Sequence, residues 1–441
     1  MTDFLLFKVL NVSLSFLFVV LAYAGKRTVG AWLNPVSIFC LFWFLYVFLP
    51  LIIAFEAPVS PFAIVYILLF CLMFSVSSYL FNWRLAIDQN KKKRQLGYYI
   101  DKKDIVFILI ALSFLAALST LIGVLKQGIS LEQILANPIS IGGIYASKRY
   151  SSEIDKNVFS QVGLSLSYVV VVLGGLLYGA RANLKSREYL IPLAFLPALT
   201  VMILQSAKGL FAFSIFLFIG GILIARVYSQ RLYLFSLSDF KRLSIYGLLG
   251  VPFIIASFLS RGLYNAGSLE VVLDKLRYYL VTYSSVHLPA FSDWFSERYF
   301  NVSIMSYKQE YFTLGFYTFT SFFRLAGDDR DVPMGVYDEF FQYGEYIKGN
   351  LYTVFRGLIT DFGLLGSLTY ALLLGLICSA MYWFLLVRRR SSFTLVFFIY
   401  FVAVSYQTYI ISSLTWLTLP FVFLLQYILM VYIMKFRVAK I

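Results

Sequence analysis

The sequence predicts an all-α protein embedded in a membrane, with about eleven transmembrane helices and one large loop outside the membrane. Three observations support this fold class. The chain is 60% hydrophobic and 13% charged, whereas about 25% of the residues in a soluble domain are charged. The apolar residues come in blocks of about 20, the length that crosses a hydrocarbon core. Lys and Arg gather in the connections on one side of these blocks.

The expected spans follow one another from the first residues to the last. Their ranges are 4–24, 32–55, 61–82, 104–125, 158–180, 189–205, 210–228, 243–259, 362–387, 393–413 and 415–434. The first run is long enough to span, and Lys26 and Arg27 follow it, so we interpret it as a retained helix. The sequence contains no evident internal repeat, which is the feature that would indicate an inverted-repeat transporter.

These spans divide the chain into three parts. Residues 1–259 hold the first eight helices, residues 260–361 form a large, partly helical extracytoplasmic loop, and residues 362–441 hold the last three helices. The connections on one side carry 22 basic and five acidic residues, and those on the other side carry 14 basic and 17 acidic residues. The first side is therefore expected in the cytoplasm. This orientation places the N-terminus outside and the C-terminus inside.

The segment 261–350 is the most informative part of the extracytoplasmic side. It holds 22 aromatic residues, and long loops of this kind are usually functional or disordered. Apolar residues recur at helical spacing over 268–283, with Ser268 able to cap that helix. A second outer connection, 126–157, contains Lys148 and Arg149 and is the other candidate lid.

Composition excludes several classes of site. The chain has one histidine, His287, so a multi-histidine metal site is excluded. The three cysteines lie in apolar runs without a CxxC pair, which indicates buried thiols. The aspartates near Arg330 resemble a metal-binding cluster in composition, and a surface loop explains them equally well; they are Asp328, Asp329 and Asp331. The net charge of +15 follows from topology and does not imply nucleic acid.

Basic residues outside the membrane are candidate anion ligands because the positive-inside trend does not explain them. Guanidinium groups bind phosphate oxygens in a bidentate fork, and aromatic faces stack on sugar rings. In the large loop and its exit these cations are Arg261, Lys275, Arg277, Arg298, Lys308, Arg324, Arg330, Lys348 and Arg356. We select Arg261, Arg277, Arg324 and Arg356 as the site candidates. Alternatively, the loop's eleven acidic residues pair with most of its cations, which then have no role in binding.

Three cations lie at expected membrane boundaries, and they are Lys208, Arg261, which directly follows the eighth span, and Arg356. Lys208 occupies a short turn between two apolar spans, where a charge is costly unless it faces a polar cavity or reaches the interface. Arg356 precedes the ninth span and shares a helix face with Tyr352 if that segment is helical. Asp361 enters the apolar run, and an intramembrane acid is a functional candidate or half of a structural ion pair. His287 is either a general base or a packing residue.

The stretch Gly349–Gly366, GNLYTVFRGLITDFGLLG, resembles a segment of the oligosaccharide repeat-unit (O-antigen) polymerases of the Wzy type. In that family an Asn-x-Tyr-Thr element precedes Asp-Phe-Gly-x-x-Gly at the start of a late helix. Here Asn350 and Tyr352 belong to the first element, and we expect both to bind the substrate. The turn at Lys208 also resembles the family, which often has Arg at this position. Lysine keeps the charge but not the bidentate geometry.

The resemblance implies a metal-independent glycosyltransferase without a cofactor and with a fold similar to the GT-C class. It would join repeat units on undecaprenyl pyrophosphate into a polysaccharide at the outer leaflet of a bacterial inner membrane. Lipids and a chain-length regulator protein are the other implied partners. Such a reaction needs a base for the acceptor hydroxyl and positive charge for the departing pyrophosphate. Asp361, Glu339 and His287 are the candidate bases.

Three other functions compete with this reading. A flippase or other transporter of lipid-linked oligosaccharides shares the substrate and the many helices, but would spread charges through several spans. An O-antigen ligase shares the chemistry and uses a different acceptor. A structural scaffold for a secretion complex would need neither the lipid-linked substrate nor the transfer chemistry.

Overall fold

A computed structural model describes most of the chain. The described residues are 2–92, 96–101, 103–151, 153–155, 157–181, 185–239, 241, 244–245, 248, 252, 255, 258, 268–308, 312–330, 332, 336–388 and 391–436. Within them, eight helices are long and apolar enough to cross a membrane. The prediction of an all-α, membrane-embedded protein is confirmed at this level.

The long apolar helices agree with the expected spans in most places. They are α1 (Thr2–Val29), α2 (Pro35–Ile53), α3 (Pro61–Val76, extended by the 3-10 turn η1, Ser77–Leu80), α6 (Lys103–Leu125), α9 (Val158–Ala180), α10 (Leu190–Gln205), α11 (Lys208–Tyr228) and α16 (Thr353–Val387). Two shorter apolar helices, α17 (Ser392–Gln407) and α18 (Thr418–Val431), match the last two expected spans. Most of the expected span 243–259 lies outside the described residues, so the count of eleven stays a prediction.

The remaining described elements are short. They are α4 (Trp83–Asn90), α5 (Gly97–Ile100), α7 (Leu131–Ala136), α8 (Pro138–Tyr150), η2 (Lys185–Tyr189), α13 (Leu269–Ser285), α14 (His287–Phe300), α15 (Phe316–Leu325), β1 (Phe341–Tyr343), β2 (Ile347–Gly349), η4 (Ser413–Thr415) and η5 (Tyr432–Phe436). Helix α13 confirms the helical spacing in the large loop, and the Ser268 hydroxyl accepts a hydrogen bond from Val271 N–H at 3.4 Å. The antiparallel hairpin β1–β2 was not expected.

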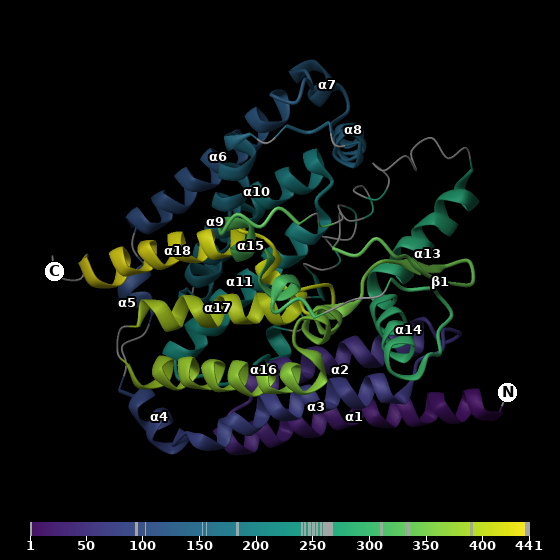
Figure 1. Cartoon of the computed structure of the whole chain (residues 1–441). Helices are drawn as coiled ribbons and strands as arrows, with labels where there is room; N and C mark the ends of the chain where they lie inside the picture. The colour runs from purple at the N-terminus through teal and green to yellow at the C-terminus, as the bar shows by residue number, and fades with distance from the viewer. Residues whose placement is uncertain are drawn as a thin grey trace. The chain divides into compact units, whose positions relative to one another are not determined.

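The chain forms two compact units, and each is built from separated stretches of sequence. Unit 1 comprises Met1–Ala86, Arg277–Phe384 and Val404–Leu419; unit 2 comprises Ile87–Leu276, Leu385–Ala403 and Pro420–Ile441. In unit 1, α1, α2 and α3 lie side by side (Figure 1). In unit 2, α9 packs most extensively against α11 and α6.

Close helix packing in unit 2 depends on glycine. A Cβ on Gly175 would lie 2.3 Å from Phe218 O, and one on Gly179 would lie 2.5 Å from the Ala225 Cβ. These two glycines are four residues apart on α9, the small-xxx-small spacing that lets membrane helices approach closely. The contact therefore fixes the ends of α9 and α11 against each other.

Helix α16 begins nine residues before the expected start at 362. Its first two turns are helical, and the chain kinks at Gly363, where φ is 69° and ψ is −179°. This backbone conformation is open to glycine and strained for other residues. The apolar pattern therefore marked the part after the kink and missed the part before it.

Phe355 anchors the first turn of α16 in the core of unit 1. Its ring centre lies 4.5 Å from that of Trp43, 4.9 Å from Phe70 and 5.9 Å from Phe291. These rings come from α2, α3 and α14, and all four side chains are buried. Aromatic pairs at such distances add to the gain from apolar burial. The packing fixes the neighbouring residue, Arg356, in position.

Candidate functional site

The candidate site in unit 1 forms where the hairpin β1–β2 leads into α16. Asn350 donates from Nδ2 to Tyr337 O at 2.9 Å, and the Tyr352 hydroxyl donates to Glu339 O at 3.2 Å. Val354 N–H donates to Thr408 O at 2.8 Å. The first two bonds tie the start of α16 to the segment before the hairpin, and the third ties it to the residue after α17. They bring Asn350, Tyr352 and Glu339, all expected site residues, close together.

Arg356 lies inside an aromatic cage, which we define as the rings of Trp294, Tyr307, Tyr337 and Tyr352. The guanidinium carbon is 4.1 Å from the ring centre of Tyr337 and 4.4 Å from that of Tyr352. The rings of Trp294 and Tyr307 follow at 5.5 and 5.6 Å. Arg356 itself is 0% exposed. A cation over aromatic faces gains about 0.5–2 kcal/mol per favourable contact, most when it is desolvated.

Glu339 is the carboxylate that meets the caged arginine. Its Oε2 accepts from Arg356 Nη2 at 3.2 Å, and its Oε1 accepts from Lys308 N–H at 3.4 Å. The Glu339 side chain is 12% exposed, against 1% for that of Arg356. The carboxylate is therefore the part of the pair that a molecule from outside can reach.

Asp293 supports the cage through its contact with Tyr307. It accepts hydrogen bonds from the Tyr307 hydroxyl at 2.8 Å, from Ile304 N–H at 2.8 Å and from Met305 N–H at 3.1 Å. Burial raises the pKa of Asp293, and these three bonds oppose that rise. Burial also raises the pKa of Tyr307 above its usual range, so its hydroxyl stays a donor. The ring of Tyr307 is thereby fixed against Arg356.

Two residues beside the cage adopt backbone conformations that are uncommon for β-branched side chains. Thr353 has a φ of 64° and follows Tyr352, and Val336 has a φ of 78° and precedes Tyr337. Left-handed φ values cost such residues free energy, and they cluster at functional sites. The strain lies next to the two rings that stack most closely on Arg356.

Asp361 holds the start of α15. Its carboxylate accepts from Tyr317 N–H at 3.0 Å, from Thr318 N–H at 2.7 Å and from the Thr318 hydroxyl at 2.5 Å. The Thr313 hydroxyl also donates to it. Asp361 is 1% exposed. A carboxylate at a helix N-terminus with this many donors is stabilised as a cap, and its geometry is that of an anchor between α15 and α16.

His287 begins α14 inside the packed aromatic part of unit 1. It is buried, with Nε2 at 2.8 Å from Tyr46 O and its ring centre 5.0 Å from that of Tyr409. Burial lowers the pKa of His287 to about 4. The geometry agrees with the packing alternative for this residue. A base role would also need access that this position does not provide.

The remaining cation candidates of the large loop are not part of the cage. Arg277 is exposed on α13, with its guanidinium carbon 4.5 Å from the ring of Tyr346 in the hairpin turn. Arg324 is exposed near the end of α15. Arg261 lies outside the described residues. Among the residues that the structure describes, no group of three or more potential metal ligands gathers; Asp331 is not among them.

Lys208 belongs to unit 2 and starts α11 after a turn in which Ser206 has a left-handed φ of 52°. Its Nζ lies 3.6 Å from the ring centre of Phe258. Arg149, from the expected second lid, donates to Gln205 O in the same turn at 2.8 Å. Lys208 therefore belongs to unit 2, and the Arg356 cage belongs to unit 1.

Sequence reasoning missed most of the cage. Trp294, Tyr307, Tyr337 and Asp293 are spread over 45 residues of the loop, and no spacing relates them to Arg356. The one usable signal was the high aromatic content of the loop. No family model matches the sequence, and the comparisons with curated proteins and with solved structures each found no match.

Proposed function

We infer that this chain is a glycosyltransferase that joins lipid-linked oligosaccharide repeat units into a surface polysaccharide. The substrates would be units on undecaprenyl pyrophosphate at the outer leaflet of a bacterial inner membrane. One observation carries the proposal. In the stretch that resembles the repeat-unit polymerases, Tyr352 and Arg356 hold Glu339 directly. Asn350 holds the carbonyl of Tyr337, two residues before Glu339.

In this proposal Glu339 is the general base. It takes the proton of the acceptor hydroxyl as the oxygen bonds to the anomeric carbon of the growing glycan, and the bond from that carbon to the pyrophosphate oxygen breaks. Of the three candidate bases, Glu339 is the one with an exposed edge; Asp361 and His287 are each 1% exposed. Arg356 fixes the direction of the carboxylate, because it is held in turn by the cage.

The departing pyrophosphate needs positive charge, and two sources are near the site. Arg356 could take a phosphate oxygen only on the side that Glu339 now occupies, since its other faces meet aromatic rings. The second source is Lys308, which is exposed and forms an ion pair with Asp338. Asp338 is the residue before Glu339 in the sequence. We assign stabilisation of the leaving group to Lys308, at the exposed edge of the site, with Arg277 and Arg324 as further surface contacts for the anion.

The decisive experiment uses the full chain in lipid nanodiscs with a synthetic repeat unit on undecaprenyl pyrophosphate. The proposal expects a ladder of polymer on the lipid carrier, with the same yield in EDTA. Absence of any ladder from folded protein would contradict it. In a deletion strain, loss of long chains with single repeat units retained indicates a polymerase. Loss of all surface glycan with lipid-linked units retained indicates a flippase or a ligase.

The orientation can be tested separately. A phosphatase reporter fused near Ser292, on α14, should be active only after export. Charge asymmetry between the two sets of loops is the reason. A cytoplasmic reporter active at this position would reverse the topology, and would exclude chemistry at the outer leaflet.

A further inference from the structure

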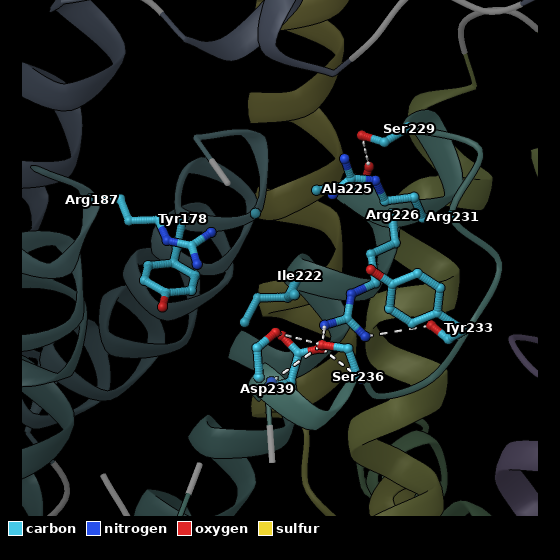
Figure 2. Close-up of a pocket in the computed structure, with 12 residues that line it drawn as sticks. Tyr178, Arg187, Ile222, Ala225, Arg226, Ser229, Arg231, Tyr233, Ser236 and Asp239 are labelled. Carbon is cyan, nitrogen blue, oxygen red and sulfur yellow. Dashed lines mark hydrogen bonds and ion pairs between the residues drawn. The ribbon is translucent and has the colours of Figure 1, made fainter. Parts of the chain in front are cut away.

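A polar cavity in unit 2 lies where α9 and α11 end. It encloses about 210 Å³, and a single water needs only about 10–15 Å³. Tyr178 and Gly179 from the end of α9 and Ile222 from the last turns of α11 line its apolar side. Arg187, Arg226 and Arg231 line its polar side. Figure 2 shows the guanidinium of Arg187 over the Tyr178 ring, and Arg226 directed toward Asp239 and Ser236.

One arginine of the cavity, Arg226, forms an ion pair within the protein. Arg226 Nη2 lies 2.7 Å from Asp239 Oδ2, and Arg226 also donates to the carbonyl of Leu234. Asp239 accepts from Ser236 N–H at 2.7 Å, and the Ser236 hydroxyl accepts from Asp239 N–H at 3.2 Å. This reciprocal pair is a capping box. Arg226 and Asp239 therefore build the wall of the cavity and neutralise each other.

The other two arginines keep their donors available. Arg187 is 7% exposed, and its guanidinium carbon lies 4.3 Å from the Tyr178 ring centre. Its nearest carboxylate, Glu188, is 3.7 Å away, beyond the range of a good hydrogen bond. Within the part of the chain that the structure describes, the Arg187 guanidinium donates no hydrogen bond. Arg231 is exposed at the rim. A nearly buried guanidinium with five donors is costly unless an acceptor joins it.

We propose that this cavity binds a phosphate group, supplied by the headgroup of an anionic lipid of the adjoining leaflet. The three arginines and the single carboxylate that line the cavity carry a net charge of +2. The long ion pair with Glu188, whose side chain is 42% exposed, offsets only part of it. Planar guanidinium groups suit phosphate oxygens. The apolar side, with Tyr178 and Ile222, suits the glycerol and first methylenes of a lipid. Basic pockets between helices at a membrane surface bind anionic headgroups in this way.

The position of the cavity favours a lipid over a soluble anion. It lies at the end of α11, opposite the turn at Lys208, and the 21 residues of that helix span about 30 Å. That length is the thickness of a hydrocarbon core. The cavity therefore lies at the level of lipid headgroups on the side away from Lys208. This inference does not depend on the proposed glycosyltransferase activity.

The test measures lipid binding to the full-length protein by native mass spectrometry, with phosphatidylglycerol and phosphatidylcholine as probes. We expect phosphatidylglycerol to bind more tightly, and Arg187→Ala/Arg231→Ala to weaken it about tenfold or more, since each charge-assisted contact is worth that order. Arg231→Ala alone should weaken it severalfold; because Arg231 is exposed, this variant folds normally. Lys92→Ala, which removes one exposed charge of unit 2 outside the cavity, should bind as the wild type does.

Inorganic phosphate separates the two sources of the ligand. Competition at millimolar concentration, lost in the double variant, supports a phosphate site that a free anion also fills. No competition, with lipid binding lost in the double variant, supports a site built for the headgroup. Equal binding of phosphatidylglycerol by wild type, Arg231→Ala and the double variant would overturn the proposal, as would equal binding of the two lipids by the wild type.

Discussion

Arg356 in unit 1 and Arg187 in unit 2 both stack on tyrosine at similar distances, 4.1 Å and 4.3 Å from guanidinium carbon to ring centre. Their surroundings differ. Arg356 has aromatic rings on several sides and a carboxylate at 3.2 Å, whereas Arg187 borders an open cavity and has its nearest carboxylate at 3.7 Å. The first arginine is committed to the protein, so it can position a neighbouring group. The second has donors left for a ligand.

The largest effect that this comparison predicts is the loss of polymer from Glu339→Gln. The variant keeps the shape of the side chain and a hydrogen-bond acceptor for Arg356 but removes the base. General base catalysis contributes about 10²–10⁴-fold, so polymer in the nanodisc assay should fall by that factor. The thermal midpoint of unfolding should fall, because the buried Arg356 loses its counter-charge, so polymer is measured well below that midpoint.

Asp338→Asn is the matched control. Asp338 is the neighbouring carboxylate, exposed and paired with Lys308, and its loss should leave polymer within severalfold of the wild type. A different result would move the base elsewhere. If Asp361→Asn abolished polymer at unchanged thermal stability while Glu339→Gln did not, the cap at α15 would be the catalytic acid–base group.

The second prediction concerns Arg356→Lys. Lysine keeps the charge but cannot stack as a plane on Tyr337 and Tyr352 or hold the Glu339 carboxylate in the same direction. Loss of one preorganised contact typically costs about 10²–10³ in rate, and we expect that loss in polymer formation. Arg84→Lys, at an exposed site on α4 of unit 1, should be nearly silent. Equal effects of the two substitutions would remove the distinction between caged and surface arginines.

Burial of His287 in unit 1 also predicts that the stability of the folded protein depends on pH. The folded protein lowers the pKa of His287 from 6.5 to about 4, through burial, so the folded state favours the neutral ring. Stability from this group is complete above about pH 6.5 and is lost as the pH falls toward 4. The loss between pH 6.5 and pH 5 is about 2 kcal/mol. Unfolding midpoints across this range should fall less for His287→Gln than for the wild type.

Sequence alone predicted the parts of this molecule that depend on local composition. Apolar blocks predicted the long helices, and helical spacing with Ser268 predicted α13, because these signals lie within one segment. The Arg356 cage depends on contacts between α14, the segment after it, the residues on either side of the hairpin, and α16. No local pattern contains these contacts. The hairpin was missed because its strands have three residues each. Asp361 was identified as unusual, but only its contacts with Thr313 and Thr318 distinguish an anchor from a base.

The smallest predicted effect is that of Lys208→Arg. Lys208 is a third type of cation, since one ring, that of Phe258, lies 3.6 Å from its Nζ. Arginine can stack on the same ring and reach the same turn, and the family that the sequence resembles often has Arg there. We therefore expect polymer yields within twofold of the wild type, and Lys208→Ala to lower them more than Lys208→Arg does. If both variants matched the wild type, the turn would have only a topological role. If Lys208→Arg were inactive, Lys208 would be as strictly defined as Arg356, and the contrast between caged and boundary cations would not hold.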